Sequence, residues 1–197
     1  MHLTDEFLKE IWCEAFAKNG KAWLRVTTGS MEPLVKPGEM ILIEKVQPRY
    51  INFGDIIVFE VHGLFVAHRV IKRYFLDGQL FFLQRGDKGG QVMEIPEDWV
   101  IGKVIAIEKI NGFLIKLDEG LGRYANCVFG CFSYLHFFFY NFFINKLKIM
   151  PKIHYLKGFY CLFKKPFNLF YQSITVLLII AVWLRQRWGS KKAKAGR

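Results

Sequence analysis

Three polar residues occur where they can act together in peptide-bond chemistry. Ser30 lies in the glycine-containing turn 28–33, where a hydroxyl can be presented beside free backbone N–H groups. A serine hydroxyl is a poor nucleophile without a base, and His68 lies within the apolar run 64–71. Asp87 opens a turn after another apolar run. These residue types fit a Ser–His–Asp site, although each also fits a structural role in a turn or strand.

Lys72 is an alternative base. Strict alternation along a strand puts its side chain on the same face as that of His68, and four residues at ~3.3 Å each separate the two by about 13 Å. Both therefore cannot serve one hydroxyl. A lysine base also requires desolvation to lower its pKa, whereas the Lys72-Arg73 pair has the character of a solvated strand end. This favours His68.

The elements that position these residues are short strands. Between residues 23 and 115, apolar runs alternate with turns that contain Gly, Pro or Asp. The runs are 23–26, 40–43, 56–59, 64–67, 80–83 and 100–107. Asp77-Gly78 predicts a tight hairpin, and no segment has the pattern of a crossover helix. We therefore expect a mainly β, antiparallel domain over 23–124, preceded by a short amphipathic helix within 1–22 that packs on it.

The C-terminal region 125–197 differs in composition from the rest of the chain. It contains none of the 17 acidic residues and carries the whole excess positive charge, which is +11 for the chain. Two uncharged apolar stretches, 127–144 and 167–184, have basic flanks and lie near the lower limit of the roughly 20 residues that cross a bilayer. Burial in a soluble core is the alternative. We expect apolar helical membrane segments and a membrane localisation, and the lack of a docking motif argues against nucleic acid.

Five motifs, in order along the chain, carry a resemblance to a known family. They are Gly-Ser-Met-Glu-Pro at 29–33, Pro-Gly-Glu at 37–39, Phe-Gly-Asp-Ile-Ile-Val-Phe at 53–59, Ala-His-Arg-Val at 67–70 and Arg-Gly-Asp at 85–87. Together they resemble type I signal peptidases of the S24/S26 clan, which also contains the self-cleaving SOS-repressor domains. The His-Arg pair resembles the archaeal, endoplasmic-reticulum and sporulation-type members, which use a histidine where other members use a lysine.

The resemblance implies roles for individual residues. It makes Ser30 the nucleophile and His68 the general base, places Asp87 near that histidine, and gives the oxyanion to the Ser30 N–H and the Thr28 hydroxyl. In this subgroup the Gly-Asp motif usually continues with Asn-Asn and a second aspartate. Here a lysine and two glycines follow, and Asp98 is the next acidic candidate. The aspartate that orients the histidine can therefore be either one, or neither.

The function expected from these features is a membrane-associated serine endopeptidase that cleaves signal- or leader-type peptides. The family resemblance implies that a peptide or preprotein binds as an added strand, with small side chains near the cut. The alternative is a catalytically inactive, membrane-anchored peptide-binding module with the same fold. No His, Cys or carboxylate cluster has metal-site spacing and no phosphate-binding loop is present, so we expect no metal or cofactor.

Overall fold

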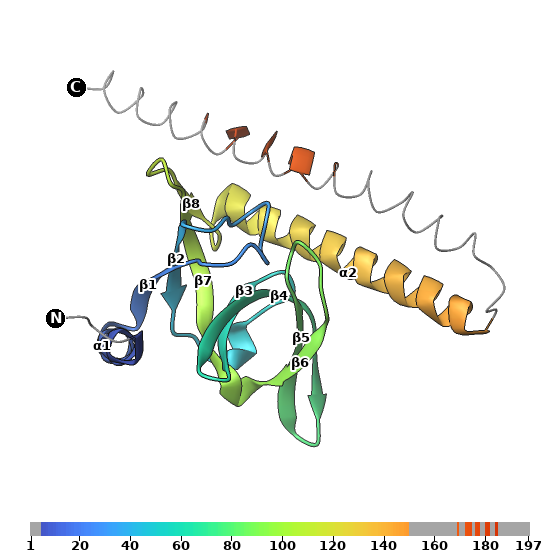
Figure 1. Cartoon of the computed structure of the whole chain (residues 1–197), viewed down its shortest axis with the longest axis horizontal. Helices are drawn as coiled ribbons and strands as arrows, with labels where there is room; N and C mark the ends of the chain where they lie inside the picture. Colours follow the sequence, from blue (N-terminus) through green and yellow to red (C-terminus); the bar gives the residue numbers. More distant parts are fainter. Residues whose placement is uncertain are drawn as a thin grey trace.

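The computed structural model describes residues 5–149 and, beyond them, residues 169, 172–174, 176, 177, 180, 181 and 184. The elements are α1 (Asp5–Asn19), β1 (Lys21–Arg25), β2 (Met40–Glu44), a 3₁₀ turn (Pro48–Tyr50), β3 (Ile56–Val61), β4 (Leu64–Leu76), β5 (Gln79–Arg85), β6 (Met93–Pro96), a 3₁₀ turn (Glu97–Trp99), β7 (Val100–Glu108), β8 (Leu114–Lys116) and α2 (Gly120–Ile149). Figure 1 shows α1 beside β1 and the long helix α2 crossing the other end of the strands.

The strands form one antiparallel sheet in the order β1-β2-β7-β3-β4-β5-β6, with β8 paired to β7. Asp77 and Gly78 join β4 to β5 with φ values of 50° and 83°. Two positive φ values are those of the type I′ turn that suits a two-residue hairpin. The expectation of a mainly β, antiparallel fold with a short N-terminal helix is confirmed.

Apolar side chains are buried in two clusters, because residues along β3 alternate between the two faces of the sheet. The first core contains Phe16, Met31, Leu34, Val35, Ile41, Ile43, Ile56, Val58, Val104, Ile107, Ile115, Leu117, Ala125 and Phe129. The second core contains Ile51, Ile57, Phe59, Val70, Leu80, Phe82 and Ile95. The first core joins α1, the turn after β1 and the start of α2 to the sheet. α1 packs there through Phe16, on which Trp12 stacks at a ring separation of 5.0 Å.

The expected C-terminal membrane segments are not supported. Among the residues that the structure describes, no helix is both long enough and apolar enough to cross a membrane. The stretch 127–144 lies within α2, where Phe129 and Ser133 are buried against the domain, and most of 167–184 lies outside the described residues. The boundary expected at residue 124 also falls inside α2. The composition predicted an apolar helix in this region. Part of its apolar surface is buried because the helix packs on the sheet.

Candidate functional site

Ser30 lies in a tight turn between β1 and β2. Backbone hydrogen bonds from Glu32 N to Gly29 O (3.2 Å) and from Val35 N to Met31 O (2.9 Å) hold the turn. The Met31 side chain beside the serine is 2% exposed in the first core and anchors the turn there. Ser30 itself is half-buried. The sequence thus presents a hydroxyl from a rigid turn at the edge of the apolar interior.

His68 lies on β4, opposite Ile57 of β3. Its ring packs edge-on against Phe59 of the second core, at a centroid separation of 6.1 Å. Its Nδ1 lies 2.6 Å from Oε1 of Gln84 on β5. An amide oxygen only accepts hydrogen bonds, so Nδ1 donates and carries the ring proton. The other nitrogen, Nε2, is then unprotonated and able to accept a proton.

Burial favours the neutral form of this imidazole. Desolvation lowers the pKa of His68 below its ordinary value of 6.5, while the Gln84 hydrogen bond and the negative charge of Asp87 act in the opposite direction. A neutral imidazole at pH 7 is the state that a general base requires. The environment of His68 therefore suits the base role that the sequence assigned to it.

Gly86 brings the serine turn and the histidine together. A Cβ atom placed on Gly86 would lie 2.7 Å from the Ser30 carbonyl oxygen and 3.2 Å from His68 Nε2. The backbone N–H of Lys88 also donates to the Ser30 carbonyl oxygen at 2.9 Å. The turn after β5 therefore contacts both residues, and only a residue without a side chain fits between them. Within the described part of the chain, no hydrogen bond joins the Ser30 hydroxyl to His68.

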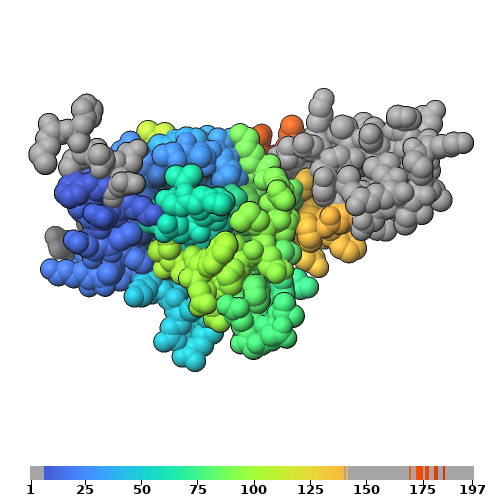
Figure 2. All heavy atoms as spheres, turned by 60° about the horizontal axis from the view of Figure 1, so that its bottom comes forward, coloured from blue at the N-terminus to red at the C-terminus, as the bar shows by residue number. Residues whose placement is uncertain are grey.

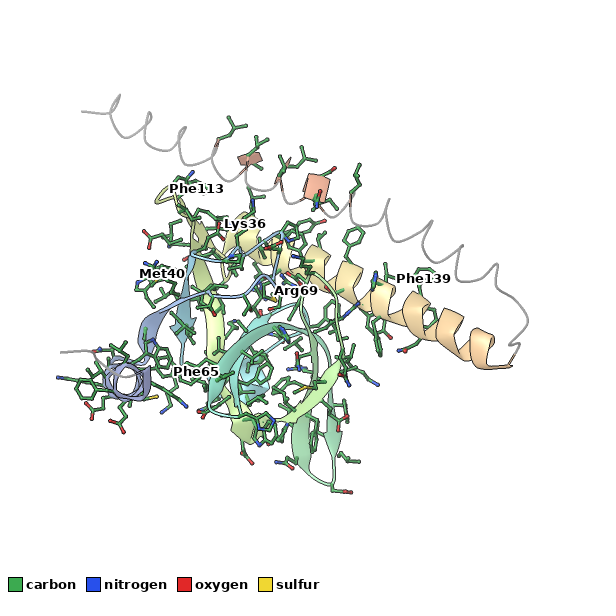
Figure 3. All side chains as sticks on the ribbon, viewed as in Figure 1. Lys36, Met40, Phe65, Arg69, Phe113 and Phe139 are labelled. Carbon is green, nitrogen blue, oxygen red and sulfur yellow. The ribbon has the colours of Figure 1, made fainter. Side chains whose placement is uncertain are left out.

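Asp87 lies in the same turn but binds Arg69. The Arg69 Nε donates to Asp87 Oδ1 at 2.7 Å and its Nη2 donates to Oδ2 at 2.6 Å, and both side chains are fully buried. Alternation along β4 points His68 and Arg69 to opposite faces of the sheet. The group that holds His68 is thus Gln84, and Asp87 acts on the imidazole only through its charge. Figure 3 shows Arg69 beneath α2.

The alternative residues lie away from this arrangement. Between Val70 and Lys72 the register of β4 against β5 shifts by one residue, and this bulge turns Lys72 to the face opposite His68. The expectation that the two share a face is therefore wrong. Lys72 is exposed and its Nζ lies 5.4 Å from the centre of the Tyr74 ring. Asp98 is also exposed and accepts a hydrogen bond from Gln79 at the other end of β5.

Thr28, the proposed second oxyanion donor, is exposed two residues before Ser30. Sequence reasoning missed two residues that hold the site, Gln84 and Arg69. A weak signal was present, since both are polar residues within apolar strands, and Arg69 also lies in a motif that carries the family resemblance. Their partners depend on the pairing of β4 with β5, which no single segment specifies.

Comparison with known proteins places this arrangement in a family. The profile of the family described as peptidase S24-like matches residues 4–105, more than half of the chain. The chain belongs to the peptidase S24-like family. The signal peptidase complex catalytic subunit SEC11C of Homo sapiens and that of Mus musculus are each 38% identical to it over 65 residues. The matched segment covers 32% of this chain and 34% of each relative, so the chain matches about a third of the length of these proteins.

These findings confirm the resemblance to signal peptidases of the S24/S26 clan that the five motifs predicted. The family match ends at residue 105, before β8 and α2. The 53–59, 67–70 and 85–87 motifs, which carry Gly54, His68, Arg69 and Asp87, all lie inside it. The helix α2, which contacts this matched part, therefore lies outside the family match itself.

Proposed function

We propose that the protein is a serine endopeptidase that cleaves signal- or leader-type peptides, with Ser30 as nucleophile and His68 as general base. The observation that carries this proposal is the state of His68. Its Nδ1 is held by Gln84, its pKa is lowered by burial, and its Nε2 lies on the side of Gly86 that also contacts the Ser30 turn. Membership of the S24-like family and the similarity to SEC11C support the same chemistry.

In this mechanism the Ser30 hydroxyl attacks the carbonyl carbon of the scissile bond while its proton passes to His68 Nε2. The Ser30 N–H and the Thr28 hydroxyl donate hydrogen bonds to the oxyanion of the tetrahedral intermediate. His68 then gives its proton to the leaving amine, which departs and leaves an ester on Ser30. A water molecule deprotonated by His68 hydrolyses that ester and restores the free serine. The attacks by serine and by water each need a neutral imidazole at their start, and the departure of each leaving group uses the proton that His68 has taken up.

The test is cleavage of a peptide library by the purified full-length protein, with new N-termini identified by mass spectrometry. Wild type should cut after a recurrent pattern of small residues, and Ser30→Ala and His68→Ala should each remove this activity. Thr27→Ala is the matched control, because Thr27 is an exposed hydroxyl in the same loop. Wild type that binds peptides but cuts none would replace this proposal with the non-proteolytic peptide-binding module.

We also propose that the region 125–197 associates with lipid bilayers. Its basic residues and its lack of carboxylates suit an anionic lipid surface, and apolar side chains such as Phe138 and Phe139 are exposed on α2. Flotation with vesicles containing phosphatidylserine measures this association. Equal recovery with neutral vesicles would contradict a role for the positive charge, and no recovery with either kind would contradict the association itself.

A further inference from the structure

The helix α2 supplies polar atoms to the buried Arg69–Asp87 ion pair. Asn126 Oδ1 accepts a hydrogen bond from Arg69 Nη1 at 2.9 Å, and the Asn126 carbonyl oxygen lies 3.4 Å from the same nitrogen. Ser133, further along α2, donates a hydrogen bond from its hydroxyl to Asp87 Oδ1 at 3.4 Å. Both members of the ion pair therefore have a partner on α2, and both α2 residues are buried.

A buried ion pair depends on such partners. Taking two charges out of water is costly, and their attraction offsets this cost only when the remaining donors and acceptors are also satisfied. The Arg69 Nε and Nη2 are used by Asp87, and Nη1 is directed to Asn126 and to the Gly54 carbonyl oxygen at 2.7 Å. The guanidinium also lies over the ring of Phe129, 5.4 Å from its centre.

The backbone of α2 is held against the same region by a close contact. Gly54 has a φ of 89°, and a Cβ atom on it would lie 2.7 Å from the Asn126 carbonyl oxygen. A Cβ on Gly130 would lie 2.7 Å from the Gly54 Cα atom. Two glycines therefore let the helix approach the loop before β3 closely enough for Asn126 to reach Arg69. In Figure 1 this part of α2 passes directly across the ends of the strands.

The ion pair is joined to the proposed catalytic residues by one turn. Asp87 lies between Gly86, where a Cβ atom would meet both the Ser30 carbonyl oxygen and His68 Nε2, and Lys88, whose N–H donates to that same oxygen. A second contact fixes the start of this turn, since Arg85 Nη1 donates to His136 Nδ1 of α2 at 2.7 Å. The contacts of α2 therefore bear on the turn that lies beside both the Ser30 turn and His68.

We propose that Asn126 and Ser133 of α2 are positioning residues for the Ser30–His68 pair, acting through Arg69 and Asp87. This inference rests on the proposed peptidase function. It makes α2 part of the working enzyme, although the helix lies beyond the family match. Figure 2 shows the part of α2 that is coloured orange on the side of the molecule away from α1.

The test compares Asn126→Leu with wild type in the full-length protein. Leucine keeps the approximate volume but removes the acceptor for Arg69 Nη1. We expect kcat for a peptide found in the library screen to fall between about tenfold and about a hundredfold, because small displacements of reacting groups cost this much. KM should change by less than about twofold, since substrate contacts are retained. Asn126→Asp, which keeps an acceptor oxygen, should recover most of kcat.

Three further variants complete the series. Ser133→Ala should lower kcat less than Asn126→Leu does, because its hydrogen bond is longer, and Ser133→Thr should restore it. Leu135→Ala is the matched control on the exposed side of α2 and should equal wild type. Circular dichroism and urea denaturation establish that each variant is folded. If Asn126→Leu does not fold, the Ser133→Ala and Ser133→Thr pair decides the question.

A second readout needs no substrate. The ring nitrogen NMR signals of His68 report its tautomer and pKa, and they should shift in Asn126→Leu but not in Leu135→Ala. Unchanged His68 signals with unchanged kcat would overturn the positioning role. If wild-type protein cuts no peptide, or Ser30→Ala cuts as well as wild type, the peptidase proposal fails instead. The NMR comparison then still decides whether α2 acts on His68.

Discussion

Replacing Gln84 by glutamate tests the arrangement around His68. In the wild-type protein the Gln84 amide oxygen accepts the Nδ1 proton at 2.6 Å, and burial lowers the pKa of the imidazole. Peptide cleavage should therefore persist below pH 6.5, the ordinary pKa of histidine. It should decline only when Nε2 becomes protonated, because a protonated imidazole cannot accept the serine proton.

A carboxylate at position 84 stabilises the protonated imidazole and raises the pKa of His68. Two unit charges about 4 Å apart interact by about 4 kcal/mol at an effective dielectric constant of about 20, and one pKa unit corresponds to about 1.36 kcal/mol. Gln84 is 1% exposed, so the new carboxylate also loses hydration, which reduces the effect. We expect the pKa to rise by about 2 units.

The assay is the pH dependence of kcat/KM, which reports ionisations of the free enzyme. In Gln84→Glu the acidic limb of the profile should move to higher pH by about 2 units, the expected rise in the pKa of His68. Gln84→Leu should lower kcat without that shift, because neither tautomer of His68 is then favoured. Gln47→Glu adds the same charge at an exposed position and should leave the profile unchanged. An acidic limb in Gln84→Glu that coincides with wild type would refute the assignment of Gln84 as the partner of the base.

Four other substitutions test the surroundings of the site. Gly86→Ala should reduce peptide cleavage by about a hundredfold, because its Cβ would meet the Ser30 carbonyl oxygen at 2.7 Å; wild-type activity would show that the two turns are not in contact. Arg69→Met should lower the free energy of unfolding in urea by about 3–5 kcal/mol, because it leaves the Asp87 carboxylate buried without its partner. Adding Asp87→Leu should recover much of that loss, and no loss in Arg69→Met would mean that the ion pair is solvated. Phe129→Ala should cost about 3–5 kcal/mol in the same measurement, whereas no change would mean that α2 does not belong to the folded domain.

The strands and the main hairpin were predictable because their signals are local. Short apolar runs separated by Gly, Pro and Asp specify strands, and Asp77-Gly78 supplies the positive φ values that its turn requires. The family motifs also predicted Ser30 and His68 as site residues, and a Cβ atom on Gly86 would lie close to atoms of both. In each case neighbouring residues along the chain contain the information.

Features that depend on pairing between distant segments were not predictable. The bulge at Val70–Lys72 arises from the register of β4 against β5, so alternation counted along β4 alone put Lys72 on the wrong face. Gln84 becomes the partner of His68 through the same pairing. The stretch 127–144 has the composition of a membrane segment, and only the contacts of Asn126 and Phe129 with the sheet show that one face of this helix is covered by protein.

The division of the interior into two cores has a consequence for the newly made chain. The serine turn is anchored in the first core through Met31, whereas the imidazole rests on Phe59 of the second. A folding intermediate with only one core formed holds one member of the proposed catalytic pair and not the other. In the proposed mechanism, the catalytic pair is therefore complete only when both cores have formed.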